Sequence, residues 1–379
     1  MEQLTEDQRA IVSAVRDFAD TELAPNALEW DRTSFFPVDA LRKAGELGLG
    51  GVYVREDYGT GLTRLDAALI FEALAHADPT IAAYISIQNM VAWMIDRFGG
   101  EALRERWLSG LCSFDLRASY CLTEAGAGSD AAALRTAATA DGDDFVITGE
   151  KQFISGAGSS DVYVVMARTG GPGPKGISAI VVPAGSEGLG FGAEEKKMGW
   201  RAQPTRRVTF DAVRVPRSNL LGAEGEGFSI AMSGLNGGRV NIGACSLGGA
   251  QWAFETAVAY VQERRAFGQP LAAQEAVVFK LADMRTKLEA ARGLLHRAAA
   301  ALDAGNPESV ELCAMAKRFA TDAGFEVANQ ALQLHGGYGY LSDYGLEKVV
   351  RDLRVHQILE GTNEIMSLIV GRSIIRGER

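Results

Sequence analysis

One glutamate, Glu360, stands where a carboxylate could act as a general base. It follows two large apolar residues, Ile358 and Leu359, and it precedes Gly361. Apolar neighbours indicate a pocket poor in water, and glycine lets the backbone turn sharply beside the carboxylate. A poorly solvated carboxylate has a raised pKa, which suits it to remove a weakly acidic proton near neutral pH. The alternative is a helix that ends at Gly361, a second helix that begins at Thr362, and an exposed Glu360 without a chemical role.

A glycine-rich segment, residues 126–131, matches the pattern G-x-G-x-x-A. It follows the apolar run 120–122 and precedes alanines that could form a helix, so by itself it indicates a dinucleotide-binding βαβ unit. Short β-like runs follow, however, where that unit needs a crossover helix and a parallel strand. The favoured interpretation is a loop whose glycines and Thr/Ser hydroxyls approach a ligand closely and bond to it.

Three further segments carry polar groups beside glycines or aromatic rings, namely residues 151–158, 262–271 and 333–340. Their residue types alone predict a core strand, a helix end with surface cations, and a helix that ends at Gly336 and Gly337. The guanidinium of Arg264 is suited to pyrophosphate, but a solvated surface residue explains it equally well.

The elements that would position these segments fall into three regions. Apolar residues recur at helical spacing up to about residue 118, with capping patterns at Thr5 and Thr63. Short β-like runs separated by glycine and aspartate turns follow, which is typical of an antiparallel sheet or barrel. Long amphipathic stretches then return. The sequence therefore predicts an α+β chain with an N-terminal helical domain (1–118), a middle antiparallel β-barrel domain (119–227) and a C-terminal four-helix-bundle domain (228–379).

Composition excludes several classes of function. The 379 residues are 47% hydrophobic and 23% charged, and the net charge of −10 argues against binding to a nucleic-acid backbone. The four cysteines and four histidines lack metal-ligand spacing, so no metal site is expected. The acidic start has no signal-peptide core, and no apolar run could span a membrane. We expect a protein without a membrane partner, cytoplasmic in a bacterium or mitochondrial if a transit peptide was removed.

The segment 358–362, with Arg351 and Asp352 before it, resembles the acyl-CoA dehydrogenase family, and the resemblance covers nearly the whole chain. In that family the glutamate of this motif is the catalytic base, so the resemblance assigns this role to Glu360. It also implies the family fold, in which FAD and an acyl-CoA lie between the middle domain and the C-terminal bundle.

The resemblance implies a set of cofactor-binding residues as well. Leu122 and Thr123 would contact the flavin ring, and Phe153 would form a flat wall beside it, where most members have tryptophan. The hydroxyl of Ser155 would lie near flavin N5, and Arg264 would reach the FAD of a neighbouring subunit. The segment 333–337, which has the pattern Q-x-H-G-G, would also contact FAD across a dimer interface, with His335 in a structural role. The complete set is Tyr120, Leu122, Thr123, Gly128, Ser129, Phe153, Ile154, Ser155, Arg264, Phe267, Gln274, Val277, Gln333, Leu334, His335, Gly336, Gly337, Thr362, Asn363 and Glu364.

Substrate contacts are implied at fewer positions. Asn236 and Arg239 would lie near the acyl and pantetheine path, although Arg239 is equally compatible with an ordinary ion pair. The apolar residues 84–94 would floor the acyl pocket, and their bulk implies a short, branched C4 chain; core packing is the alternative. The implied substrate-binding set is Ser129, Asn236, Arg239, Gly361 and Arg372.

The implied reaction is FAD-dependent α,β-dehydrogenation of isobutyryl-CoA to methacrylyl-CoA, a step of valine breakdown. The implied electron acceptor is an electron-transferring flavoprotein, and the implied assembly is a homotetramer built as a dimer of dimers. Dehydrogenation of 2-methylbutyryl-CoA or of a short straight-chain acyl-CoA is the near alternative. An acyl-CoA oxidase is less favoured because oxidases of this fold are usually longer. A non-catalytic acyl-CoA-binding scaffold is disfavoured by the intact Glu360 and flavin segments.

Overall fold

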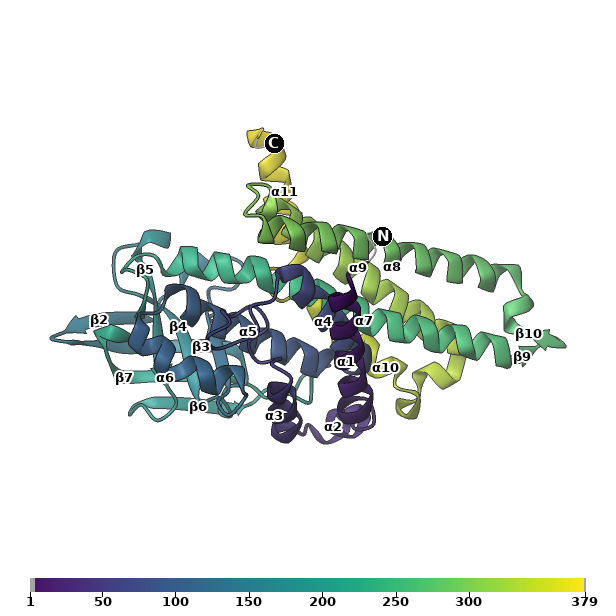
Figure 1. Cartoon of the computed structure of the whole chain (residues 1–379), viewed down its shortest axis with the longest axis horizontal. Coiled ribbons are helices and arrows are strands. Elements are labelled where there is room, and N and C mark those ends of the chain that lie inside the picture. Colours follow the sequence, from purple (N-terminus) through teal and green to yellow (C-terminus); the bar gives the residue numbers. More distant parts are fainter. Residues whose placement is uncertain (1–3, 378–379) are drawn as a thin grey trace.

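The computed structural model describes residues 4–377. A β-sheet lies at one end of an elongated molecule, and long helices run from it to the opposite end, where strands β9 and β10 lie (Figure 1). The chain order is helices, sheet and helices, as the sequence predicts.

The N-terminal part consists of short helices followed by two longer, buried ones. Thr5 and Thr63 form the two predicted capping boxes, with Thr5 Oγ1 accepting from the amide of Gln8 at 3.1 Å and Thr63 Oγ1 accepting from the amide of Asp66 at 3.1 Å. Pro79 opens the helix that Gly99 ends. The elements are α1 (Glu6–Phe18), a π-helical turn (Ala19–Leu23), α2 (Ala27–Thr33), α3 (Val38–Glu46), α4 (Arg64–Ala77), α5 (Pro79–Phe98) and α6 (Glu101–Cys112).

The middle part is one open, mixed sheet. Its strands are β1 (Ala118–Cys121), β2 (Ala137–Asp141), β3 (Asp144–Ser155), β4 (Val162–Arg168), β5 (Ile177–Pro183), β6 (Leu189–Glu194), β7 (Thr205–Pro216) and β8 (Leu220–Leu221). They pair in the order β6-β7-β3-β2-β4-β5-β8, and β1 adds to β4.

The predicted closed antiparallel barrel is therefore not confirmed. Strand β1 pairs parallel with β4 along its full length, and β2 meets β4 in parallel at one register position. Within residues 4–377 the two ends of the order, β6 and β8, do not pair. Turn residues in a sequence reveal hairpins between consecutive strands, whereas pairing between distant strands leaves no local signal.

The C-terminal part has three long helices and two shorter ones, where the sequence predicts a four-helix bundle. The elements are α7 (Gly227–Glu263), β9 (Arg265–Ala266), β10 (Gln269–Pro270), α8 (Glu275–Asp303), α9 (Ser309–His335), α10 (Leu346–His356) and α11 (Asn363–Arg376). Helix α7 has 37 residues, so it is about 55 Å long. It connects the sheet to the far end of the molecule (Figure 1).

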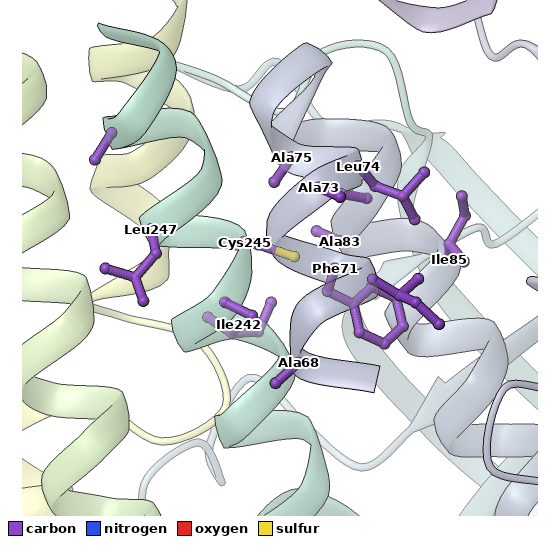
Figure 2. Close-up of a cluster of buried hydrophobic side chains, with 14 of the residues drawn as sticks. Ala68, Phe71, Ala73, Leu74, Ala75, Ala83, Ile85, Ile242, Cys245 and Leu247 are labelled. Carbon is purple, nitrogen blue, oxygen red and sulfur yellow. The ribbon is translucent and has the colours of Figure 1, made fainter. Parts of the chain in front are cut away.

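The N-terminal and C-terminal helices share one hydrophobic core. Phe71 of α4 and Ile242 and Cys245 of α7 are buried side by side in it (Figure 2). At Gly248 of α7, a Cβ atom would overlap the backbone of Glu72 in α4, so only glycine permits this close approach of the two helices. Helix α7 is thereby held against α4 along its central turns.

A buried polar network joins α10 to the other two parts. Lys348 Nζ donates to Asp78 Oδ1 at 2.9 Å and to Asp352 Oδ2 at 2.8 Å, and all three side chains are buried. Asp352 also accepts from Thr80 Oγ1 at 3.0 Å and from the backbone amide of Trp200 at 2.6 Å. Burial alone would lower the pKa of Lys348, but the two carboxylates outweigh it and raise that pKa. Helix α10 is therefore locked to α5 and to the loop after β6.

Replacing Lys348 by methionine should destabilise the protein by about 3–5 kcal/mol, because two carboxylates would stay buried without their cation. The measurement is the urea midpoint of unfolding. The control is Arg32→Met, which breaks the exposed pair with Glu29 and should barely move the midpoint. Equal midpoints for the two variants would show that the network does not lock α10.

Candidate active site

Glu360 lies in a tight turn between α10 and α11. Its φ of 56° and the φ of 90° at Gly361 are both positive. A left-handed conformation costs a non-glycine residue about 1–2 kcal/mol, so the surrounding contacts have to hold Glu360 in it. The amide of Asn363 closes the turn by donating to the carbonyl of Gln357 at 3.0 Å. A break between two helices, which the alternative interpretation of this segment predicts, is thus present. Thr362 caps α11, the second of these helices.

The carboxylate of Glu360 has one buried oxygen without a protein partner. Glu360 is half-buried as a residue, yet its Oε2 is buried and makes no hydrogen bond to any other residue in the described part of the chain. Burial raises the pKa of Glu360 to about 7, although Arg239 and Lys317 act to lower it. The carboxylate is thus available as an acceptor and changes its charge near neutral pH.

Two adjacent glycines of α7, Gly237 and Gly238, make room for charged side chains of this site. A Cβ at Gly238 would overlap Oε2 of Glu360, and a Cβ at Gly237 would overlap the guanidinium of Arg64. Arg64 lies 3.6 Å from the ring centroid of Tyr53, within range of a cation–π interaction. Sequence reasoning missed Arg64 and Tyr53, and the double glycine of α7 was the only local signal of a close approach.

Arg239 is buried beside the turn but does not pair with the carboxylate. Its Nη1 donates to Asn236 Oδ1 at 2.7 Å, and its Nε makes a longer bond of 3.4 Å to the backbone carbonyl of Glu360. Among residues 4–377, no carboxylate lies within ion-pair distance of Arg239. The ion-pair alternative for Arg239 therefore does not hold within the chain. Burial lowers the pKa of Arg239.

Lys317 is a second buried cation at the turn, and sequence reasoning missed it. It lies on α9 and its side chain is fully buried. Its Nζ donates to the carbonyl of Gly361 at 2.7 Å and to Asn363 Oδ1 at 2.9 Å. Burial lowers its pKa to about 8. A single lysine in a helical stretch gives no sequence signal of such a contact.

The sheet presents Tyr120 of β1 to the site. Its hydroxyl is buried and makes no hydrogen bond within the described residues. Burial raises the pKa of Tyr120 well above its ordinary value, and the charge of Glu360 adds to this effect. Tyr120 on the sheet and Glu360 in the turn thus interact electrostatically from two different parts of the fold, and the tyrosine hydroxyl has no partner within the described residues.

The glycine-rich loop after β1 lies against strand β3. Lys151 Nζ donates to the carbonyl of Leu122 and to Glu124 Oε1, both at 2.9 Å, and the carbonyl of Thr123 accepts from the amide of Gln152 at 2.8 Å. Beyond this anchor, Ser129 is exposed and Gly128 has open space around it. The loop is thus anchored at one side and exposed at the other, and strands β2 and β3 follow it where a dinucleotide-binding unit needs a crossover helix.

Phe153 projects from a bulge in β3. The register with β7 shifts between Lys151 and Ile154, and Phe153 has a φ of 59°. A bulge re-aims a side chain, and here it leaves Phe153 63% exposed while Ile154 is buried. The carbonyl of Ser155 accepts from the hydroxyl of Ser119 at 2.7 Å, which ties β3 to β1. A flat aromatic face is thereby presented outward next to the loop at Thr123.

A second group of the predicted residues lies at the far end of α7. Arg264 and the segment from Gln333 to Gly337 line one cavity of about 370 Å³. His335 stacks on Tyr260 with ring centroids 4.1 Å apart, and its Nδ1 bonds to the carbonyl of Ala331 at 2.9 Å. Burial lowers the pKa of His335. These contacts agree with a structural role for His335.

This second group is remote from Glu360 within one chain. Arg239 lies within α7, and Arg264 caps the C-terminal end of this helix, 25 positions later. This separation corresponds to about 37 Å along the helix axis. Phe267 is 95% exposed between β9 and β10, and Gln274 and Val277 stand at the start of α8. These predicted cofactor residues therefore form two groups, one on the middle sheet and its loop after β1 and one at the C-terminal end of α7.

The remaining predicted residues lie on α11. The side-chain amide of Asn363 points inward, and its Nδ2 donates to Thr321 Oγ1 at 3.0 Å and to Asp322 Oδ1 at 2.7 Å. Glu364 is exposed in the first turn of the helix, and Arg372 is exposed in its last part. The backbone of Asn363 is engaged as well, because its amide donates to the carbonyl of Gln357 and its carbonyl accepts from Ser367 Oγ at 2.8 Å. Glu364 and Arg372, in contrast, present their side chains outward.

Comparison with known proteins places the chain in a family. Models of the N-terminal, middle and C-terminal domains of acyl-CoA dehydrogenases match residues 5–115, 119–213 and 225–375. The chain belongs to the acyl-CoA dehydrogenase family. It is therefore an oxidoreductase and a flavoprotein that uses FAD.

Individual relatives match over almost the full chain. Isobutyryl-CoA dehydrogenase of Bos taurus, a mitochondrial protein, is 52% identical over 98% of this chain and 90% of its own length. Butyryl-CoA dehydrogenase of Megasphaera elsdenii superimposes with a TM-score of 0.96 at 36% identity, covering 99% of this chain and 100% of that chain. A chain in a solved structure of the electron transferring flavoprotein of Acidaminococcus fermentans gives a TM-score of 0.97 at 39% identity, covering 99% and 100%.

The side chains that line the site fit a flavin. Phe153 offers an exposed flat face, and Tyr120 offers a buried hydroxyl without a protein partner. In the loop from Thr123 to Ser129, open space surrounds Gly128, since a Cβ added there would meet no atom within 4 Å. Within the part of the chain that the structure describes, no cluster of His, Cys, Asp or Glu could hold a metal ion. None of the helices there is long and apolar enough to cross a bilayer.

Gly238→Ala should slow acyl-CoA oxidation by about a hundred-fold, because the new Cβ displaces the carboxylate of Glu360 and small misplacements of catalytic groups cost this much. The measurement is the rate at which an acyl-CoA bleaches the bound flavin without oxygen. The matched control is Gly293→Ala on α8, where a Cβ meets no atom within 4 Å. Wild-type rates in Gly238→Ala would show that α7 does not confine Glu360.

Proposed function

We propose that this acyl-CoA dehydrogenase oxidises isobutyryl-CoA to methacrylyl-CoA, with Glu360 as the catalytic base. The observation that carries the proposal is the buried Oε2 of Glu360, which has no partner within the described residues and is held in a left-handed turn. Support for the substrate comes from the 52% identity to an enzyme that bears the name of this reaction. The proposal places the chain in valine breakdown.

The chemistry follows from the environment of the carboxylate. Glu360 removes the proton from the α-carbon of the thioester, and its pKa of about 7 matches the needs of a base near neutral pH. Bound FAD would supply the acceptor for the β-hydrogen and its electron pair, so that a double bond would form between the α- and β-carbons. The backbone amide of Glu360 donates to the thioester oxygen as negative charge develops there. Gly361 keeps that amide unobstructed.

The groups that would hold FAD come from the sheet and from the C-terminal end of α7. Leu122, Thr123 and Ser129 would contact the flavin, Phe153 would lie against its ring, and Ser155 would offer a hydroxyl to it. Arg264 and the segment 333–337 line a cavity about 37 Å from Arg239 along α7, and they act on the FAD of a second copy. This geometry supports a dimer in which sites are shared, and two such dimers form the proposed homotetramer.

Substrate size is set where α5 meets α7. Met90 and Met94 are buried, and a Cβ at Gly234 would overlap Met94 Cε and lie 3.5 Å from Met90 Cγ. Little space is left beside the two glycines that face Arg64 and Glu360. A short acyl chain is therefore proposed, in contact with Asn236 and Arg239, whereas Arg372 on exposed α11 is assigned to the CoA portion.

The proposed electron acceptor is an electron-transferring flavoprotein. A chain in a structure of such a flavoprotein is 39% identical to this one, which supports the assignment. Relatives occur in mitochondria and in bacteria, so we propose the mitochondrial matrix or the bacterial cytoplasm. We further propose domains at 1–118, 119–227 and 228–379.

Glu360→Gln should retain FAD and bind isobutyryl-CoA, but anaerobic bleaching of the flavin should slow by about 100- to 10,000-fold, because the general base is lost. Stopped-flow absorbance gives the rates. The wild-type panel contains isobutyryl-CoA, 2-methylbutyryl-CoA and butyryl-CoA, and isobutyryl-CoA should bleach fastest. Faster bleaching by another thioester would overturn the substrate, rapid peroxide release in air would indicate an oxidase, and no bleaching at all would indicate a scaffold.

Arg264→Ala should lose FAD, because a guanidinium that contacts pyrophosphate is removed. The flavin-to-protein ratio measures this, and Arg265→Ala at the neighbouring exposed position is the control. Co-expression with Glu360→Gln should restore activity, since one site of a mixed dimer then has an intact Glu360 and the partner's intact arginine. Failure of the mixed protein to regain activity would contradict shared sites.

A further inference from the structure

The turn that carries Glu360 is bound to helix α9 at both of its ends. Before Glu360, Gln357 Nε2 donates to Asp322 Oδ1 at 2.7 Å. After it, Lys317 Nζ donates to the carbonyl of Gly361 at 2.7 Å and to Asn363 Oδ1 at 2.9 Å. Lys317 and Thr321 are spaced i and i+4, so they share one face of α9, and Asp322 follows Thr321. One stretch of α9 thereby contacts the chain before and after the two left-handed residues.

The contacts of Lys317 leave its positive charge unneutralised by a direct partner. Both atoms that accept from Nζ belong to neutral groups, and no carboxylate in the described residues lies within ion-pair distance of it. The charged groups that face Lys317 are Glu360, Arg239, Asp322 and Glu364. The charge of Lys317 also lowers the pKa of His356. A buried lysine without an ion-pair partner is costly, which a purely structural residue could avoid.

We propose that Lys317 is a positioning residue for the reaction: its ammonium holds the carbonyl of Gly361 and the side chain of Asn363, and thereby aims the carboxylate and the amide of Glu360. The proposal rests on the proposed function of Glu360 as the base. It also explains why Arg239 bonds to the Glu360 carbonyl instead of the carboxylate: the two cations bind the consecutive carbonyls of Glu360 and Gly361 and leave Oε2 free.

The charge of Lys317 gives the proposal a pH signature. Glu360 has to be ionised to remove a proton, so the bleaching rate rises with pH through the pKa of Glu360, which is about 7. The groups that face Glu360 are Arg239, Lys317, Tyr53 and Tyr120. Loss of one nearby cation raises the pKa of a carboxylate. Removal of the Lys317 ammonium therefore moves the midpoint of the pH profile to higher pH.

The test is Lys317→Met in the FAD-loaded, full-length protein, with anaerobic bleaching by isobutyryl-CoA followed across pH. Bleaching should slow by about a hundred-fold through misplacement of the base, and the midpoint should move up. Lys317→Arg should return the midpoint toward that of the wild type, because it keeps the charge. The control is Lys43→Met, an exposed lysine paired with Glu22 on the surface. Lys317→Met with the rate and midpoint of the wild type would overturn the proposal.

Two further measurements keep the role of Lys317 testable. If Lys317→Met does not fold, Thr321→Val removes the hydroxyl that accepts from Asn363 without removing a charge. It should slow bleaching and leave the midpoint in place, and an unchanged rate would overturn the proposal. Amide hydrogen exchange of residues 357–363 needs no activity. It should accelerate in Lys317→Met, and unchanged exchange would exclude the hold on the turn even if no acyl-CoA bleaches the wild-type flavin.

Discussion

The left-handed backbone at Glu360 and Gly361 is the constraint on which the rest of the site depends. A glutamate does not adopt a φ of 56° without contacts that enforce it. The enforcement comes from Asn363 closing the turn, from Lys317 on α9 and from Arg239 on α7. The result is an orientation that leaves Oε2 of the carboxylate without a protein partner, as the proposed role of Glu360 as the base requires.

Electrostatics at the turn follows from where the two cations bind. Arg239 and Lys317 donate to backbone carbonyls, and their charges act on Glu360 through space. A direct ion pair would have occupied the carboxylate oxygens and lowered the pKa of Glu360 further. The observed balance between burial and two nearby charges leaves that pKa at about 7. The binding of both cations to backbone carbonyls thus explains both the free Oε2 of Glu360 and the near-neutral pKa of this residue. Both properties match the chemistry of a general base.

Helix α7 carries the site mechanically. Its glycines let α4 and the Glu360 turn approach its backbone, and its length separates Arg264 and the cavity beside it from the Glu360 turn. The buried network of Lys348, Asp78 and Asp352 fixes α10, whose end leads into the turn, against α5 and the loop after β6. The shared core of α4, α5 and α7 (Figure 2) keeps these helices in place, so the turn is held by all three parts of the chain.

The sequence by itself determined the order of helices, sheet and helices, the caps at Thr5 and Thr63, and Glu360 as the candidate base, because capping patterns, period and a motif are local properties. Only the tertiary structure decided the parallel pairing of β1 with β4, the open sheet and the inward-facing side chain of Asn363. It alone also decided the contacts that Lys317, Arg64 and Gly238 make at the site. These features join residues 41 or more positions apart, and a contact at that separation depends on how helices and strands pack. No local pattern of residue types encodes such a contact.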